Sequence, residues 1–120
     1  MLALAAWPAA HAWAQAAEPP APPLPNEFSD VARKNYAAQM KQARGLLADK
    51  QYTEGIAILD ALTKDRPREP QARFLKAVAL ADQGKLDDAA VIYRELVADF
   101  PELPEPRNNL AAVYAQKGEY

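Results

Sequence analysis

The chain has 120 residues, a formal net charge of −2 and a composition that is half hydrophobic, and this length leaves room for one domain at most. It has no Cys, and its single His is His11, so the rest of the chain lacks disulfides, thiol nucleophiles, His-based general bases and the usual zinc ligand sets. Its longest basic cluster is Arg33-Lys34, which does not make a nucleic-acid-binding surface.

Residues 1–14 have the pattern of a secretory signal peptide, because an apolar run ends in the small-x-small triplet Ala12-Trp13-Ala14. The positively charged start of such peptides is missing, so the true start could lie upstream of Met1, or the sequence could be clipped. A disordered Ala-rich tail is one alternative. A membrane anchor is another, although Pro8 and His11 interrupt a run shorter than the about 20 apolar residues that span a bilayer. We expect cleavage after Ala14 and a periplasmic or otherwise exported protein without a membrane span.

Residues 15–28 form a linker rich in Pro and Ala. Its segment EPPAPPLP, residues 18–25, is expected to be an extended, solvated and semi-rigid tether before the folded part. The alternative is a polyproline ligand, since residues 19–23 could form a polyproline helix.

From Ser29 the apolar residues recur at helical spacing, and Ser29 or Asn26 could cap the first helix. This helix is expected to run to about Asp49, and the turn Lys50-Gln51 leads to a partner helix over residues 53–64. Gly55 lies inside that partner helix, where Gly is unfavourable, which predicts a close approach of the two helices. The apolar stripe of the first helix consists of Val31, Tyr36, Met40, Ala43, Leu46 and Leu47.

The following segment RPREP, residues 66–70, is interpreted as a solvated turn, with an anion site formed by its two Arg residues as the alternative. Residues 71–101 then show two amphipathic helices that are separated at Gly84 and ended by Pro101. A last helix is expected from about Pro104 to Lys117. The partner of that helix should begin where the sequence stops, so we expect the protein to continue.

Small, large and Pro positions recur with a period of 34 residues, which is typical of a helix–turn–helix repeat. Pro67 recurs at Pro101. The other sets are Lys50, Gly84 and Gly118; Ala43, Ala77 and Ala111; Leu46, Leu80 and Tyr114; and Tyr52, Leu86 and Tyr120.

With Ala77, Leu80, Ala89, Tyr93 and Pro101 at these places, the chain resembles the tetratricopeptide repeat family, and in particular its exported members in Gram-negative bacteria. The resemblance covers about residues 36–120. The Trp of the family pattern is absent, since Gln39, Arg73 and Arg107 stand there. The resemblance implies an all-α solenoid of about two and a half repeats in an array over residues 29–120, with units at about 36–69, 70–103 and 104–120, the last incomplete.

The resemblance further implies a protein-binding surface, the concave face formed by the first helix of each unit. On this face Arg44 could meet a carboxylate and Phe74 could anchor an apolar side chain, although Phe74 and Val78 could equally be core residues. A clamp for C-terminal carboxylates, known in some members, is not implied, because Met40 and Leu75 occupy its positions. The expected partner-binding residues are Met40, Arg44, Leu47, Phe74, Val78, Asn108, Ala112 and Gln116.

The sequence contains no metal-binding, phosphate-binding or nucleophile motif, so we expect no catalytic residues, no metal and no cofactor. The predicted function is a non-catalytic scaffold of the bacterial envelope that binds a peptide or protein. The alternative is an adaptor at the N-terminal end of a longer protein whose catalytic or ligand-binding domain follows residue 120. A weaker alternative is self-association through the helix of the third unit.

Overall fold

A computed structural model describes residues 18–20 and 30–118 of the chain. The predicted signal peptide over residues 1–14 lies outside the described residues. So do the rest of the linker, residues 15–17 and 21–28, and the proposed caps Asn26 and Ser29.

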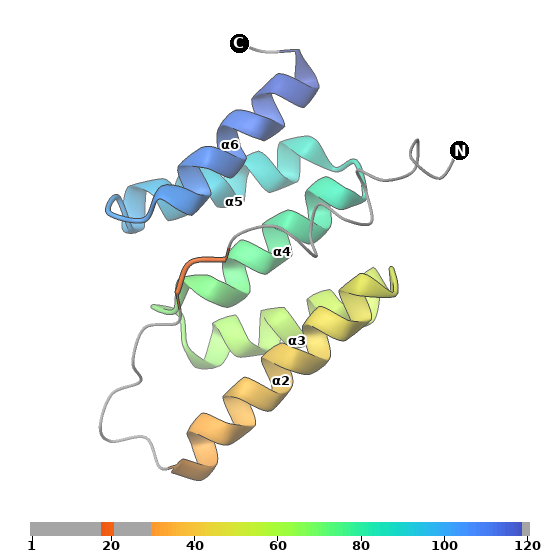
Figure 1. Cartoon of the computed structure of the whole chain (residues 1–120), viewed down its shortest axis with the longest axis vertical. Coiled ribbons are helices and arrows are strands. Elements are labelled where there is room, and N and C mark those ends of the chain that lie inside the picture. Colours follow the sequence, from red (N-terminus) through yellow and green to blue (C-terminus); the bar gives the residue numbers. More distant parts are fainter. Residues whose placement is uncertain (1–17, 21–29, 119–120) are drawn as a thin grey trace.

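Five helices follow one another along the described chain: α2 (Asp30–Ala48), α3 (Tyr52–Asp65), α4 (Pro70–Asp82), α5 (Leu86–Asp99) and α6 (Pro104–Lys117). Each packs mainly against its neighbours in the chain, and together they form a stack with α2 at one end and α6 at the other (Figure 1). Helices α2 and α3 are the first and second helices of one unit, and α4 and α5 those of the next. The structure is therefore an all-α helical repeat, as the period predicted.

The observed helix bounds agree with the sequence to within one residue in the first unit. Helix α2 ends at Ala48 rather than Asp49, and α3 covers Tyr52–Asp65 rather than residues 53–64. Helices α4 and α6 both begin with Pro, which has no N–H to lose in a first turn.

The turns inside the units share one backbone design. Lys50, Gly84 and Gly118 have positive φ angles of 63°, 82° and 79°. In the first turn, Gln51 N–H donates to the carbonyl of Leu46, and in the second, Lys85 N–H donates to that of Leu80, both at 2.8 Å. Such bonds satisfy carbonyls that a helix end leaves free. Identical turns at equal spacing make successive helix pairs stack with the same geometry.

The core is continuous through the stack, because each helix buries one apolar stripe against the next. Phe74 and Tyr93 are fully buried and meet edge to face, with ring centroids 5.8 Å apart. Gly55 lets α3 approach α2, since a β-carbon on it would lie 2.7 Å from Cδ2 of Leu47. The close approach predicted at Gly55 is therefore confirmed.

Two segments expected to be solvated are packed against the helices instead. Pro19 is fully buried and Glu18 is partly buried, so the expectation of a solvated tether is wrong for these two residues. In the link between α3 and α4, the Arg66 guanidinium lies 4.5 Å from the centroid of the Tyr36 ring, and Glu69 is buried. The expectation of a solvated turn therefore holds for Pro67 and Arg68, which are exposed, and is wrong for Glu69 and Pro70, which are buried.

Candidate functional site

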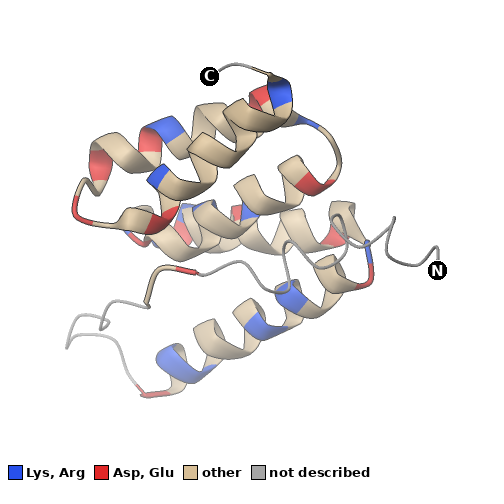
Figure 2. Cartoon of the chain, turned by 45° about the horizontal axis from the view of Figure 1, so that its top comes forward, with Lys and Arg blue, Asp and Glu red and all other residues tan. Residues whose placement is uncertain are grey.

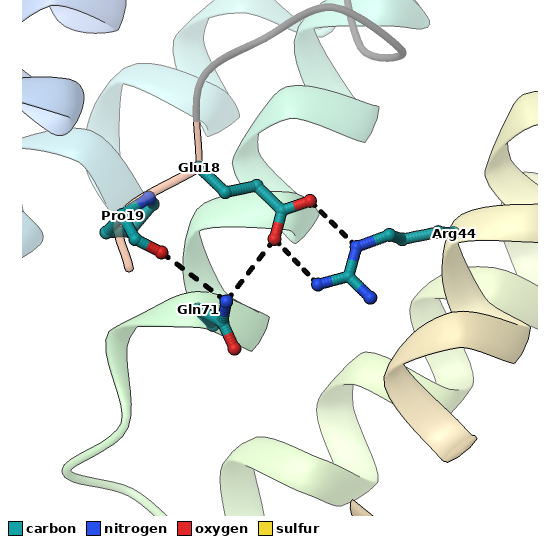
Figure 3. Close-up of polar contacts among 4 residues, drawn as sticks. All are labelled: Glu18, Pro19, Arg44 and Gln71. Carbon is teal, nitrogen blue, oxygen red and sulfur yellow. Dashed lines mark hydrogen bonds and ion pairs between the residues drawn. The ribbon is translucent and has the colours of Figure 1, made fainter. Parts of the chain in front are cut away.

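The candidate site lies where the first helices of two successive units, α2 and α4, come together. Arg44 projects from α2 and Gln71 from the first turn of α4, and both reach the short segment Glu18–Pro20 (Figure 3). We refer to Arg44 and Gln71, with the surface between them, as the Arg44–Gln71 site.

Arg44 holds the Glu18 carboxylate with two parallel hydrogen bonds. Its Nε donates to Oε2 and its Nη2 to Oε1, each at 2.7 Å. This paired geometry is stronger and more directional than a single contact, and it raises the pKa of the Arg44 guanidinium. Both side chains keep partial contact with solvent, 33% exposed for Arg44 and 21% for Glu18.

Gln71 forms hydrogen bonds with both a side chain and the main chain of the same segment. Its Nε2 lies 3.4 Å from Glu18 Oε1 and 3.4 Å from the carbonyl oxygen of Pro19. The Pro19 ring is fully buried beside it, whereas Pro20 is exposed. Arg44 and Gln71 thus contact a carboxylate and a main-chain carbonyl on two consecutive residues of the same chain.

The Tyr36 side chain lies on α2 two turns before Arg44, next to Arg66 and Glu69. Burial, and next the charge of Glu69, raise the pKa of the Tyr36 hydroxyl to about 12. Burial also raises the pKa of Glu69, against the opposing effect of Arg66. Arg66 Nη2 in turn lies 3.4 Å from the carbonyl of Ala32. This polar cluster fixes the link before α4 against α2, which holds Gln71 and Arg44 at their separation.

Helix α2 gives the site a positive surrounding. The helix carries four basic residues, Arg33, Lys34, Lys41 and Arg44, and one acidic residue, Asp30. Basic positions recur along α2 in Figure 2. A chain of net charge −2 therefore has a local cationic helix, which favours acidic ligands.

The repeat pattern agrees with a comparison to known families. A family model described as tetratricopeptide repeat matches residues 40–104, more than half of the chain. The chain belongs to the tetratricopeptide repeat family. No curated protein and no solved structure was found to match it.

Tetratricopeptide repeats generally mediate protein–protein interactions and typically act as non-catalytic scaffolds, so protein partners are expected for this array. Within residues 18–20 and 30–118, no group of acidic or imidazole side chains is arranged to hold a metal ion. In that same part of the chain no helix is long and apolar enough to cross a bilayer.

The predicted partner-binding residues fall into three groups. Met40, Leu47, Phe74 and Val78 belong to the buried core. Arg44 is half-buried and forms the site above. Asn108, Ala112 and Gln116 are exposed on α6. The structure brings Arg44 together with Gln71, which sequence reasoning had not included, and whether any of these residues contacts a partner stays a prediction.

Neither Gln71 nor the Glu18–Pro19 segment could be identified from the 34-residue period. The contacts of Glu18 join residues separated by 26 and 53 positions, and one of the partners lies in a segment whose composition is that of a linker. One signal existed for Gln71: it precedes Phe74 by three residues and so shares a helical face with it.

Proposed function

We propose that this tetratricopeptide repeat protein is a non-catalytic scaffold of the bacterial envelope that binds an extended peptide or a protein partner on the face formed by α2, α4 and α6. The observation that carries the proposal is that a non-helical segment of the chain itself, Glu18–Pro20, already lies against α2 and α4. Gln71 donates to a main-chain carbonyl, and Arg44 grips the side chain beside it. Recognition of an extended peptide requires side chains of this kind, which form hydrogen bonds with the peptide's main chain.

The equivalent positions on α6 are exposed to solvent. Ala112 follows Val78 by one repeat, as Val78 follows Arg44, and Ala112 is exposed together with Asn108 and Gln116. These side chains are small or amide-bearing, and so they can lie under an extended main chain and donate hydrogen bonds to it. A peptide that starts at α2 would therefore continue over α4 to α6.

The experiment is a selection of random peptides, displayed on phage, against the full chain, followed by amide chemical-shift mapping of the selected peptides. We expect shifts on α2, α4 and α6. The variant Ala112→Arg should weaken binding, because it places a long charged side chain on the proposed face. Ala98→Arg is the matched control, because Ala98 is also an exposed Ala, but on the second helix α5.

Selected peptides whose shifts lie on α3 and α5, or equal losses for the two variants, would contradict the proposal. So would a selection that returns no binding peptide from libraries of several lengths.

The proposed envelope location rests on residues 1–14, whose sequence has the signal-peptide pattern. It is tested by cell fractionation and by the intact mass of the native protein. A periplasmic species lacking the residues before Gln15 supports export. A cytoplasmic species that retains Met1 refutes it.

The alternative is that this array is the adaptor part of a longer protein with a catalytic or ligand-binding domain after residue 120. Ala111 favours it, since Ala43 and Ala77 in the same register are fully buried and Ala111 is exposed. The same exposed face would serve self-association, for which concentration-dependent sedimentation is the test. An intact mass well above 13.2 kDa distinguishes the longer protein from both other functions.

A further inference from the structure

We propose that the Arg44–Gln71 site is a recognition site for an acid–proline motif, a carboxylate residue followed by Pro in an extended partner peptide, and that the chain's own Glu18–Pro19 is its built-in competitor. This inference rests on the proposed function and specifies its ligand and its regulation. Every contact in the site is made to groups that a separate peptide of the same two residues would carry.

The acid requirement follows from Arg44. Two parallel N–H···O bonds of 2.7 Å match the two oxygens of a planar carboxylate. An amide is neutral and has one acceptor oxygen, so it cannot replace the carboxylate. The equivalent positions of the next units hold Val78 and Ala112, which cannot make such a pair. An acidic residue is therefore recognised at one place on this face, which sets the register of the bound peptide.

The preference for Pro follows from hydrogen bonding. Pro19 is fully buried, yet its burial hides no N–H, because Pro has none. Its carbonyl is met by Gln71 at 3.4 Å. Any other residue at this place would bury a donor, and a buried donor without a partner costs about 1–3 kcal/mol on general grounds. Pro also has its φ fixed in advance, which reduces the entropy lost on binding.

The internal segment is held firmly enough to compete and loosely enough to leave. The Arg44–Glu18 pair is partly exposed, the two Gln71 contacts are long, and the next residue, Pro20, is exposed. A segment tethered through residues 21–29 to the start of α2 acts at an effective concentration on the order of millimolar. A partner must therefore displace the internal segment. The partner's apparent affinity is its intrinsic affinity multiplied by the fraction of sites that the internal segment leaves free.

The test compares the full wild-type chain with an open variant, Glu18→Gln with Pro19→Ala. The probe is a blocked synthetic peptide with the sequence QAAEPPAPP of residues 15–23, and its twin carries Gln in place of Glu. The matched control is Pro101→Ala with Glu102→Gln, which alters an exposed Pro and an exposed Glu in the turn before α6. Circular dichroism establishes that each variant is folded.

We expect the probe to bind the open variant at least about tenfold more tightly than it binds the wild type or the control, because the tethered competitor is gone. The Gln twin should lose this binding. Addition of Arg44→Gln to the open variant should abolish it, and Arg44→Lys, which keeps the charge without the paired geometry, should weaken it. The Arg44→Lys variant keeps the test usable if the Arg44→Gln variant does not fold.

Equal affinity of the wild type and the open variant, or equal binding of the probe and its Gln twin, overturns the inference. If random peptides without an acid–proline pair bind the α2, α4 and α6 face while the probe does not, the inference fails and the proposed function stands. If neither binds, the proposed function fails too. A wild-type chain that sediments as a dimer exchanging Glu18–Pro19 between copies overturns competition within one chain.

Discussion

Gly55 of α3 lies directly against Leu47 of α2, and a β-carbon at Gly55 would stand 2.7 Å from Cδ2 and 3.0 Å from Cγ of that Leu. Leu47 is 1% exposed, so it cannot turn out into solvent and could move only within the packed core. The two residues fix how closely the first helix pair packs. The distance between α2 and α3 is thus set by the absence of one side chain.

We expect Gly55→Ala to destabilise the protein by about 1–3 kcal/mol, because the strain of overpacking exceeds the helix propensity of about 1 kcal/mol that Ala gains. Gly45→Ala is the matched control. Gly45 also lies inside a helix, but its β-carbon would meet nothing within 4 Å, so this variant should be more stable by about 0.5–1 kcal/mol. Urea unfolding measures both. Stabilisation by Gly55→Ala would show that Leu47 does not limit the approach.

A second prediction concerns Lys50, a side-chain-bearing residue with a φ of 63° where the next unit has Gly84. The left-handed conformation costs an ordinary residue about 1–2 kcal/mol. Lys50→Gly should therefore stabilise the fold by up to about 1 kcal/mol, and Gly84→Ala should destabilise it by a similar amount. The space around Gly84 is open, so its change is one of backbone conformation alone. Thermal unfolding of both variants checks this, and shifts of equal sign would refute it.

A third prediction is a loss of stability in alkali. Burial raises the pKa of the Tyr93 hydroxyl to about 12, and burial is also the main cause that raises the pKa of Tyr36 and of Tyr52 to about 12. The unfolded chain releases these protons near pH 10 and the folded chain near pH 12. Their stabilising contribution is thus complete below about pH 10 and is lost as the pH rises to about 12.

Tyr93→Phe should reduce the slope of stability against pH in this window. It should also lower stability by the same amount at all lower pH values, because the hydroxyl that accepts a 3.2 Å hydrogen bond from Asn109 Nδ2 is removed. Urea midpoints measured at intervals from pH 8 to 11.5 separate the slope from the offset. An unchanged slope in the variant would mean that Tyr93 does not titrate as its burial requires.

Sequence alone predicted the helices, the turns and the repeat, because each depends on local pattern. The 34-residue spacing of Ala43 and Ala77, of Gly84 and Gly118, and of Pro67 and Pro101 is the direct consequence of stacking identical helix pairs. Gly55 could be interpreted correctly for the same reason, since a costly residue inside a helix needs a packing cause.

Of the Arg44–Gln71 site, the sequence pointed to Arg44 alone, as a residue that could meet the carboxylate of a partner. In the structure Arg44 pairs with Glu18 of the same chain, and its contact with a partner stays a prediction. Residues 18–25 have the composition of a solvated tether, and no period relates Glu18 to Gln71. Contacts of this kind depend on where a non-repeating segment passes over a finished array. Local propensity carries no information about that path.

The last prediction uses three Ala residues that share one register. Ala43 and Ala77 are fully buried, each in the first helix of its unit, and Ala111 is exposed on α6. Ala77→Leu should destabilise the protein by about 1–3 kcal/mol, because Ala77 is fully buried and three further carbons would have to fit into a packed core. Ala111→Leu should change the free energy of unfolding by no more than about 0.5 kcal/mol. Chemical unfolding at one protein concentration measures both.

Equal destabilisation by Ala77→Leu and Ala111→Leu would show that Ala111 is covered in solution, by a second copy or by chain beyond α6. A repeat of Ala111→Leu over a range of protein concentrations tells these two apart, since only cover by a second copy weakens on dilution. Tolerance of Ala111→Leu together with intolerance of Ala77→Leu would establish that one register carries two environments. The repeat then fixes the fold of each unit, and the neighbouring helix decides whether a small residue is required there.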